Sequence, residues 1–93
     1  MKYIIMGKLS ADWATRQGER TESAKAKLAE LGITLESVYY TLGKYDFVDV
    51  VDAPDAEAML AFSVWYANKG FGRLVTSPAF DDAVMQSAMK RAG

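Results

Sequence analysis

The sequence has no cysteine and no histidine among its 93 residues. The absence of cysteine excludes disulfide bonds, thiolate zinc sites and a cysteine nucleophile, and it fits a reducing compartment. The absence of histidine removes the commonest general base and metal ligand at neutral pH. The carboxylates are scattered along the chain, so we expect no metal site, and no sequence motif indicates a cofactor.

Long apolar segments are also missing. The apolar run at residues 1–7 is far shorter than the core of a signal peptide, and no segment is long enough to span a membrane. The 11 basic and 12 acidic residues give a net charge of −1, so no overall field attracts the chain to nucleic acid or anionic lipid. We therefore expect a cytoplasmic protein that binds neither nucleic acid nor a membrane.

The composition is that of a folded domain, with 51% hydrophobic and 25% charged residues. A chain of this length fits one domain, and such a domain buries only about 60 to 65% of the surface that its unfolded chain exposes. No disulfide adds to its stability, so oligomerisation is the expected support. We assign residues 1–80 to the domain proper and residues 81–93 to a C-terminal helical extension of it.

The hydrophobic pattern predicts the order β-α-β-β-α-β followed by a C-terminal helix. This is the order of a ferredoxin-like α+β fold. Right-handed crossovers then give an antiparallel sheet with strand order 4-1-3-2 and both helices on one face. The predicted strands cover residues 2–9, 33–42, 47–52 and 73–77, and the predicted helices cover residues 10–32, with a break near Gly18, 54–69 and 81–91.

The first three predicted strands carry apolar residues on both faces. Ile4 and Ile5 are neighbours in the first strand, as are Val50 and Val51 in the third. With helices on one face only, the other face would expose an apolar surface of the size that marks an interface. The pattern predicts a face-to-face homodimer, a dimeric α/β barrel. The alternative is that the C-terminal helix folds back over this face within the same chain.

Residues 40–48, Tyr-Thr-Leu-Gly-Lys-Tyr-Asp-Phe-Val, resemble the GYD-domain family of small prokaryotic proteins, as do the strand at 3–9 and Asp-Ala-Pro-Asp at 52–55. Gly43, Tyr45 and Asp46 correspond to the three residues that give the family its name. The resemblance covers roughly residues 2–80 and implies a ferredoxin-like domain that pairs into a dimeric α/β barrel. It implies no activity, because the family has no established general function.

The predicted topology brings a set of aromatic and charged residues to one edge of the sheet. Aromatic walls with a few charged groups suit a planar or anionic small molecule. The alternative is that these side chains belong to the core or to an interface. The candidate ligand-binding residues are Trp13, Arg16, Tyr40, Tyr45, Trp65 and Arg73, and Lys8, Asp46 and Tyr66 share their neighbourhood.

Asp49 interrupts the otherwise apolar third strand. A carboxylate on a buried sheet face needs a partner or a proton, and Lys8 on the adjacent strand is the predicted partner. As a functional group, Asp49 would be a general base of raised pKa, with Tyr45 and Lys8 completing a candidate catalytic set. The alternative is a structural pair or an edge of the dimer interface.

Three functions remain open from the sequence. The first is a homo-oligomeric GYD-type module that binds a small aromatic or anionic ligand or none. The second is a small cofactor-independent enzyme, an isomerase or monooxygenase by analogy with other dimeric α/β barrels. The third is an interaction subunit that docks through the methionine and valine stripe of its C-terminal helix.

Overall fold

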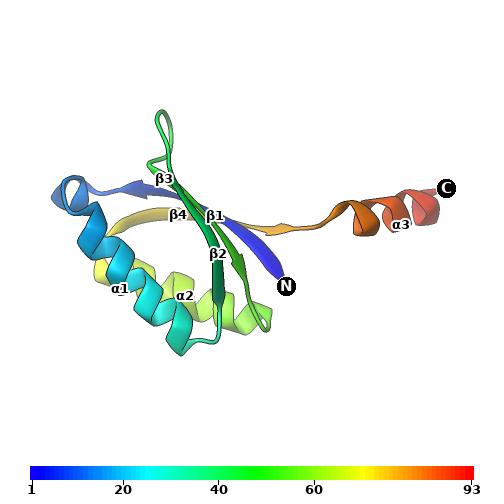
Figure 1. Cartoon of the computed structure of the whole chain (residues 1–93), viewed down its shortest axis with the longest axis horizontal. Helices are drawn as coiled ribbons and strands as arrows, with labels where there is room; N and C mark the ends of the chain where they lie inside the picture. Colours follow the sequence, from blue (N-terminus) through cyan, green and yellow to red (C-terminus); the bar gives the residue numbers. More distant parts are fainter.

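The computed structural model describes all residues from 1 to 93. Two helices lie on one face of a four-stranded antiparallel sheet, and a third helix stands apart (Figure 1). This is an α+β arrangement with the predicted order of elements. The elements are β1 (Lys2–Leu9), a short 3-10 helix η1 (Ala11–Trp13), α1 (Gln17–Glu30), β2 (Thr34–Tyr40), β3 (Phe47–Asp52), α2 (Ala56–Lys69), β4 (Gly72–Ala79) and α3 (Asp82–Ala92).

The strands are ordered β2-β3-β1-β4, which is 4-1-3-2 from the other edge, and all neighbours are antiparallel. The central strands are therefore β1 and β3. Their register places Ile5 opposite Asp49 and Met6 opposite Val48. Because successive side chains alternate between the faces of a strand, this register determines which face each residue occupies.

The first predicted helix is divided in two, and the division comes before Gly18. The short helix η1 ends at Trp13 and α1 begins at Gln17. Ser10 does not cap the first turn with its side chain, as an N-cap serine would. Its hydroxyl instead donates a hydrogen bond to the Gly70 carbonyl at 3.2 Å, which ties the end of β1 to the end of α2.

The two outer strands differ from their predicted lengths. β2 is shorter than expected and has an irregular register between Leu35 and Ser37. β4 is longer than expected and continues through Pro78, where the sequence predicted its end. The proline is tolerated because β4 is an edge strand. On the outer side of an edge strand a backbone N–H has no neighbouring strand to bond, so a proline there costs no hydrogen bond of the sheet.

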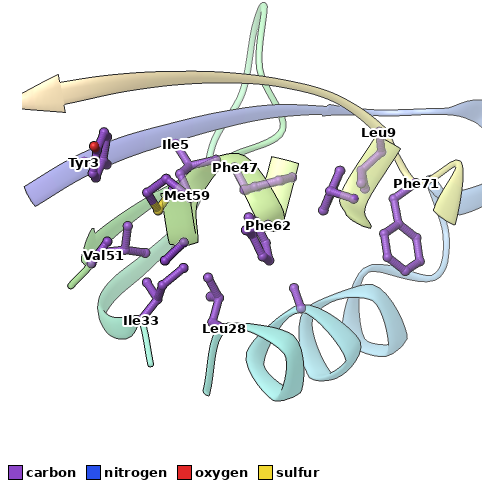
Figure 2. Close-up of a cluster of buried hydrophobic side chains, with 14 residues drawn as sticks. Tyr3, Ile5, Leu9, Leu28, Ile33, Phe47, Val51, Met59, Phe62 and Phe71 are labelled. Carbon is purple, nitrogen blue, oxygen red and sulfur yellow. The ribbon is translucent and has the colours of Figure 1, made fainter. Parts of the chain in front are cut away.

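The hydrophobic core fills the space between the sheet and the helices α1 and α2 (Figure 2). Ile5 and Val51 lie at its centre and have no exposed surface. The ring of Phe47 lies directly over Gly7, and a methyl group at position 7 would overlap this ring. Glycine at position 7 therefore lets the Phe47 side chain lie flat against the sheet.

The face of the sheet opposite the helices has no cover within the chain. We call this surface the open face. Its central residues are half-buried by their neighbours, whereas Tyr39 and Val75 are 65% and 43% exposed. The apolar residues of the open face are Ile4, Met6, Tyr39, Val48, Val50 and Val75.

The helix α3 extends away from the sheet and buries none of its residues (Figure 1). The alternative that it folds back over the open face of its own chain is therefore wrong. Asp81 caps the helix by accepting a hydrogen bond from the Val84 amide at 3.0 Å. No helix of the chain combines the length and the apolar character needed to cross a membrane.

Candidate functional site

Asp49 lies on the helix-covered face of the sheet and is 5% exposed. Lys8 lies on the other face together with Ile4 and Met6, because side chains two residues apart along a strand share a face. The Lys8 ammonium is 3.4 Å from a carboxylate oxygen of Asp46. The predicted pair of Asp49 and Lys8 is therefore wrong, and the candidate catalytic set of Asp49, Tyr45 and Lys8 is divided between the two faces.

Asp46 fastens the turn between β2 and β3 to the end of β1. It accepts hydrogen bonds from the Leu9 amide at 2.8 Å and from Lys8. The hydrogen bond from the Leu9 amide, assisted by Lys8, holds the pKa of Asp46 below its ordinary value. Gly43 has a φ of 102°, which favours glycine in the same turn. Gly43 and Asp46, two of the three residues that give the GYD family its name, thus shape this turn and fasten it to β1.

The predicted ligand-binding residues fall into three groups. In the first, the ring of Phe71 packs against the rings of Trp13 at 4.5 Å and Trp65 at 5.8 Å, and the Arg16 guanidinium stacks on Trp13 at 3.9 Å. Phe71 occupies the position between the two indoles. These contacts favour the interpretation of Trp13 and Trp65 as packing residues.

The second group lines a hollow at one end of the open face, with a volume of about 410 Å³. We call it the basic groove. It brings Tyr45 and Arg73 together with Lys8, as the sequence predicted, and adds Lys44, which the sequence analysis did not include. Its remaining lining comes from Leu74 and Val75.

Tyr40 stands alone as the third group. Its hydroxyl is 2.9 Å from the hydroxyl of Thr21 on α1, so it belongs to the helix-covered face. Thr21 also accepts a hydrogen bond from the Arg20 guanidinium at 3.0 Å. Tyr40 therefore contributes to holding Arg20 in place.

Arg20 is a second residue, after Lys44, that the sequence did not single out. It is only 1% exposed, and its guanidinium stacks on the ring of Phe47 at 3.9 Å. Arg20 precedes Ala24 by four residues and Leu28 by eight, so it falls on the apolar stripe of α1. A charged residue at that spacing was a signal for a buried polar site.

We call Arg20, Asp49 and Tyr66 the buried polar cluster. Burial raises the pKa of Asp49 to about 6 and that of Tyr66 to about 12, while the charge of Arg20 opposes both shifts. The Arg20 Nε, one oxygen of Asp49 and the Tyr66 hydroxyl make no hydrogen bond of good geometry, although the Arg20 side chain lies close enough to the Tyr66 hydroxyl to lower its pKa. The cluster therefore has one acid, one base and one cation in an apolar environment. No group of three or more acidic side chains is placed to hold a metal ion.

Solved structures share this fold. MtbAldR superposes with a TM-score of 0.68 and 21% identity over 86% of this chain and 52% of its own length, so this chain spans about half of MtbAldR. The 5-chloro-2-hydroxyhydroquinone dehydrochlorinase TftG from Burkholderia phenoliruptrix AC1100 gives a TM-score of 0.61 and 13% identity, over 89% of this chain and 97% of that one. Identities this low show only that the class of fold is ferredoxin-like.

The sequence places the chain within that class. A family model described as the GYD domain matches residues 3–89, and the chain belongs to this family. A curated relative from Thermus thermophilus is 28% identical over 92 residues, 95% of this chain and 97% of the relative, and is named "Glutamine synthetase and cystathionine beta-lyase binding protein". Both matches extend past residue 80, so they include most of α3, beyond the limit of the resemblance noted in the sequence.

Proposed function

We propose that this protein is a homo-oligomeric protein-binding module. Two copies pair through their open faces into a dimeric α/β barrel, and the paired module binds another protein. The observation that carries the proposal is the apolar open face of a sheet whose opposite face is already covered. A cytoplasmic location, expected from the sequence, is part of this proposal.

The open face has the distribution of residues that protein interfaces share. Its centre is apolar, with Ile4 and Val50 side by side in the register of β1 and β3. One end carries the ion pair of Lys2 and Glu36 at 2.9 Å, and the other carries Lys8 and Arg73. An apolar centre between charged ends favours burial of the centre against a second copy.

The helix α3 supplies a second apolar surface, which we propose as the contact with the other protein. Val84, Met85, Ala88 and Met89 recur at helical spacing, whereas Gln86 lies on the polar side. An isolated helix of this length is marginally stable in water, so packing against a partner would stabilise it. The relative from Thermus thermophilus suggests glutamine synthetase and cystathionine β-lyase as the first partners to test.

Self-association is tested by analytical ultracentrifugation of the wild-type chain and of two full-length variants. Each variant has one added charge, on opposite sides of the domain. Val50→Lys on the open face should weaken the dimer at least tenfold, because the lysine would be buried without a partner. Val64→Lys on α2 is the matched control, since Val64 is 70% exposed on the outer side. A wild-type chain that is monomeric at micromolar concentration, or equal effects of the two lysines, would contradict the pairing.

Partner binding is tested with purified glutamine synthetase and cystathionine β-lyase from the source organism, measured by biolayer interferometry. Met85→Glu should lower the affinity at least tenfold and leave the dimer intact. Gln86→Glu adds the same charge on the polar side of α3 and should have little effect. Binding that is insensitive to Met85→Glu would exclude α3 as the docking surface, and no binding to either enzyme would remove both as partners.

A second candidate function is the binding of a small anion in the basic groove. The specific observation is that Lys44 and Arg73 have no acidic partner within 4.0 Å, whereas Lys8 is paired with Asp46. Tyr45 provides an aromatic wall beside these charges. Titration with benzoate and inorganic phosphate in a calorimeter tests this function, and Arg73→Gln should weaken any binding that occurs in the groove.

A further inference from the structure

The buried polar cluster lacks a structural explanation. Arg20, Asp49 and Tyr66 come from α1, β3 and α2, and they are 1%, 5% and 2% exposed. No ion pair joins Arg20 to Asp49 within 4.0 Å, and each of the three side chains has an unpartnered polar atom. Burying such groups is costly, and apolar residues at these positions would fill the core of a small domain at less cost.

The cation of the cluster is held in a fixed orientation. The Arg20 guanidinium stacks on Phe47, whose ring lies over Gly7, and one of its nitrogens donates to Thr21. Thr21 is in turn bonded to Tyr40. Two of the three guanidinium nitrogens are thus left for other contacts, and Nε is one of them. A cation held in place before a reaction is an effective stabiliser of developing negative charge.

The cluster is close to a surface opening. Tyr66 lines a groove of about 300 Å³ between α2 and β4, together with Ser63 and Leu74. Leu74 lies opposite Gly7 and therefore on the helix-covered face of the sheet, the face that also carries Asp49. Neither Arg20 nor Asp49 lines the groove, so Tyr66 is the member of the cluster that a molecule in the groove meets first.

We propose that the buried polar cluster is a proton-transfer site for a small uncharged carbonyl compound that enters through the groove beside Tyr66. The charges of Arg20 and Asp49 balance, so the site favours a neutral molecule. The inference goes beyond the proposed function, because it uses the face of the sheet that pairing leaves covered by helices. Its test is independent of dimerisation and of partner binding.

The chemistry needs no cofactor. An Asp49 oxygen removes a proton from the carbon next to the carbonyl, and the electrons of that C–H bond form a C=C bond. The carbonyl π electrons move to oxygen, and the N–H of Arg20 Nε and the O–H of Tyr66 hydrogen-bond to the resulting enolate. If the proton on Asp49 is replaced from solvent before a proton returns to the same carbon, the ketone has exchanged a hydrogen with solvent, and return to another carbon of the enolate system gives an isomer.

The surroundings of Asp49 suit a base that works near neutral pH. The groups that face it are Arg20 from α1 and Tyr66 from α2, whereas its strand neighbours Ile5 and Val38 do not titrate. A base with a pKa of about 6 is ionised at neutral pH and still binds a proton well. The rate of proton removal should therefore rise with pH and level off above about pH 7.

The experiment measures exchange of the α-protons of hydroxyacetone and cyclopentanone in D₂O by proton NMR, with the full chain. We expect exchange above the buffer rate, a loss of at least 100-fold in Asp49→Asn, and a loss of at least tenfold in Tyr66→Phe. Tyr3→Phe, which removes a hydroxyl that contacts the Met1 sulfur at 3.8 Å, is the matched control and should exchange at the wild-type rate.

Circular dichroism and thermal melting establish that each variant is folded. A wild-type chain that does not accelerate exchange of either ketone would overturn the proposal. So would exchange that persists in folded Asp49→Asn, or that falls equally in Tyr3→Phe and Tyr66→Phe. A pH profile without a rise near pH 6 would exclude Asp49 as the base.

Discussion

The two faces of the sheet carry similar apolar residues and have different surroundings. Ile5 faces α1 and α2 and has no exposed surface, whereas its neighbour Ile4 lies on the open face and has no cover within the chain. Figure 2 shows Ile5 among the core side chains, with Phe47 and Met59 nearby. Apolar residues on both faces of a strand predict a cover for each face, but they do not show what supplies it.

The two faces also differ in where their charged residues lie. The open face has its charged residues at the two ends, where Lys2 pairs with Glu36 and Lys8 with Asp46. The helix-covered face has Arg20 and Asp49 within it, without an ion pair. The helix-covered face, which needs no second chain to cover it, is therefore the face with the unsatisfied polar groups. This difference points to a different use for each face.

The largest effect is expected from shortening a side chain on the helix-covered face. Ile5→Ala should lower the free energy of unfolding by roughly 2 to 5 kcal/mol, because the cavity is enclosed by the core. Urea denaturation measures this loss, which should be the same at every protein concentration as long as the substitution does not weaken the dimer. A loss below about 1 kcal/mol would contradict the central position of Ile5.

The next largest effect concerns the charge on that same face. Asp49 has a pKa of about 6 when folded and an ordinary value of 3.8, so the folded protein binds the proton more tightly than the unfolded chain does. The cost of burying the carboxylate is absent below about pH 4 and complete above about pH 6, where it is on the order of 3 kcal/mol.

Asp49→Asn removes this dependence on pH. Relative to the wild type, its free energy of unfolding should increase by about 3 kcal/mol between pH 4 and pH 8. Urea denaturation of both proteins at several pH values measures the difference, and general effects of pH cancel because both chains share them. A constant difference over this range would mean that Asp49 titrates normally.

A smaller effect is expected from the same truncation on the open face. Ile4→Ala should cost about 1 kcal/mol at concentrations where the chain is monomeric, because Ile4 is only half-buried there. At concentrations where the dimer forms, the loss should be greater, since stability then includes association. Equal losses for Ile4→Ala at low and high concentration would contradict the pairing of open faces.

The smallest effect is expected on the outer side of the helices. Leu60 is exposed on α2, and neither the core nor the open face includes it. Leu60→Ser should change the free energy of unfolding by no more than about 0.5 kcal/mol at any protein concentration. A larger loss, measured by the same denaturation, would reveal an interface on the helical layer.

Much of the fold follows from local patterns in the sequence. The alternation in residues 2–9 and 47–52 located the two central strands with correct bounds, whereas Pro54 placed the start of α2 two residues early, because Asp55 is the N-cap. The length of β4 was wrong because a proline usually ends a strand, whereas the edge position of β4 permits it. Whether a strand lies at the edge or at the centre is a property of the whole sheet, and no local sequence pattern contains that information.

The site was harder to predict because it depends on which face each residue occupies. Asp49 was identified correctly as the exceptional residue of β3, but its partner was sought on the wrong face. The relevant cation, Arg20, comes from a helix that crosses over the sheet, so its position depends on packing between layers. The strand register and the spacing of Arg20, Ala24 and Leu28, taken together, would have brought Arg20 and Asp49 to the same side.

The two edge strands restrict how the chain can assemble. A free edge is a template to which further strands add without limit, and this is the origin of fibrous aggregates. Here β2 has an irregular register at Leu35 and Ser37, and β4 contains Pro78. Both interruptions make a regular ladder along the edges harder to extend. Growth by strand addition is thereby disfavoured, which fits the proposed pairing of open faces, a closed contact that ends after two copies.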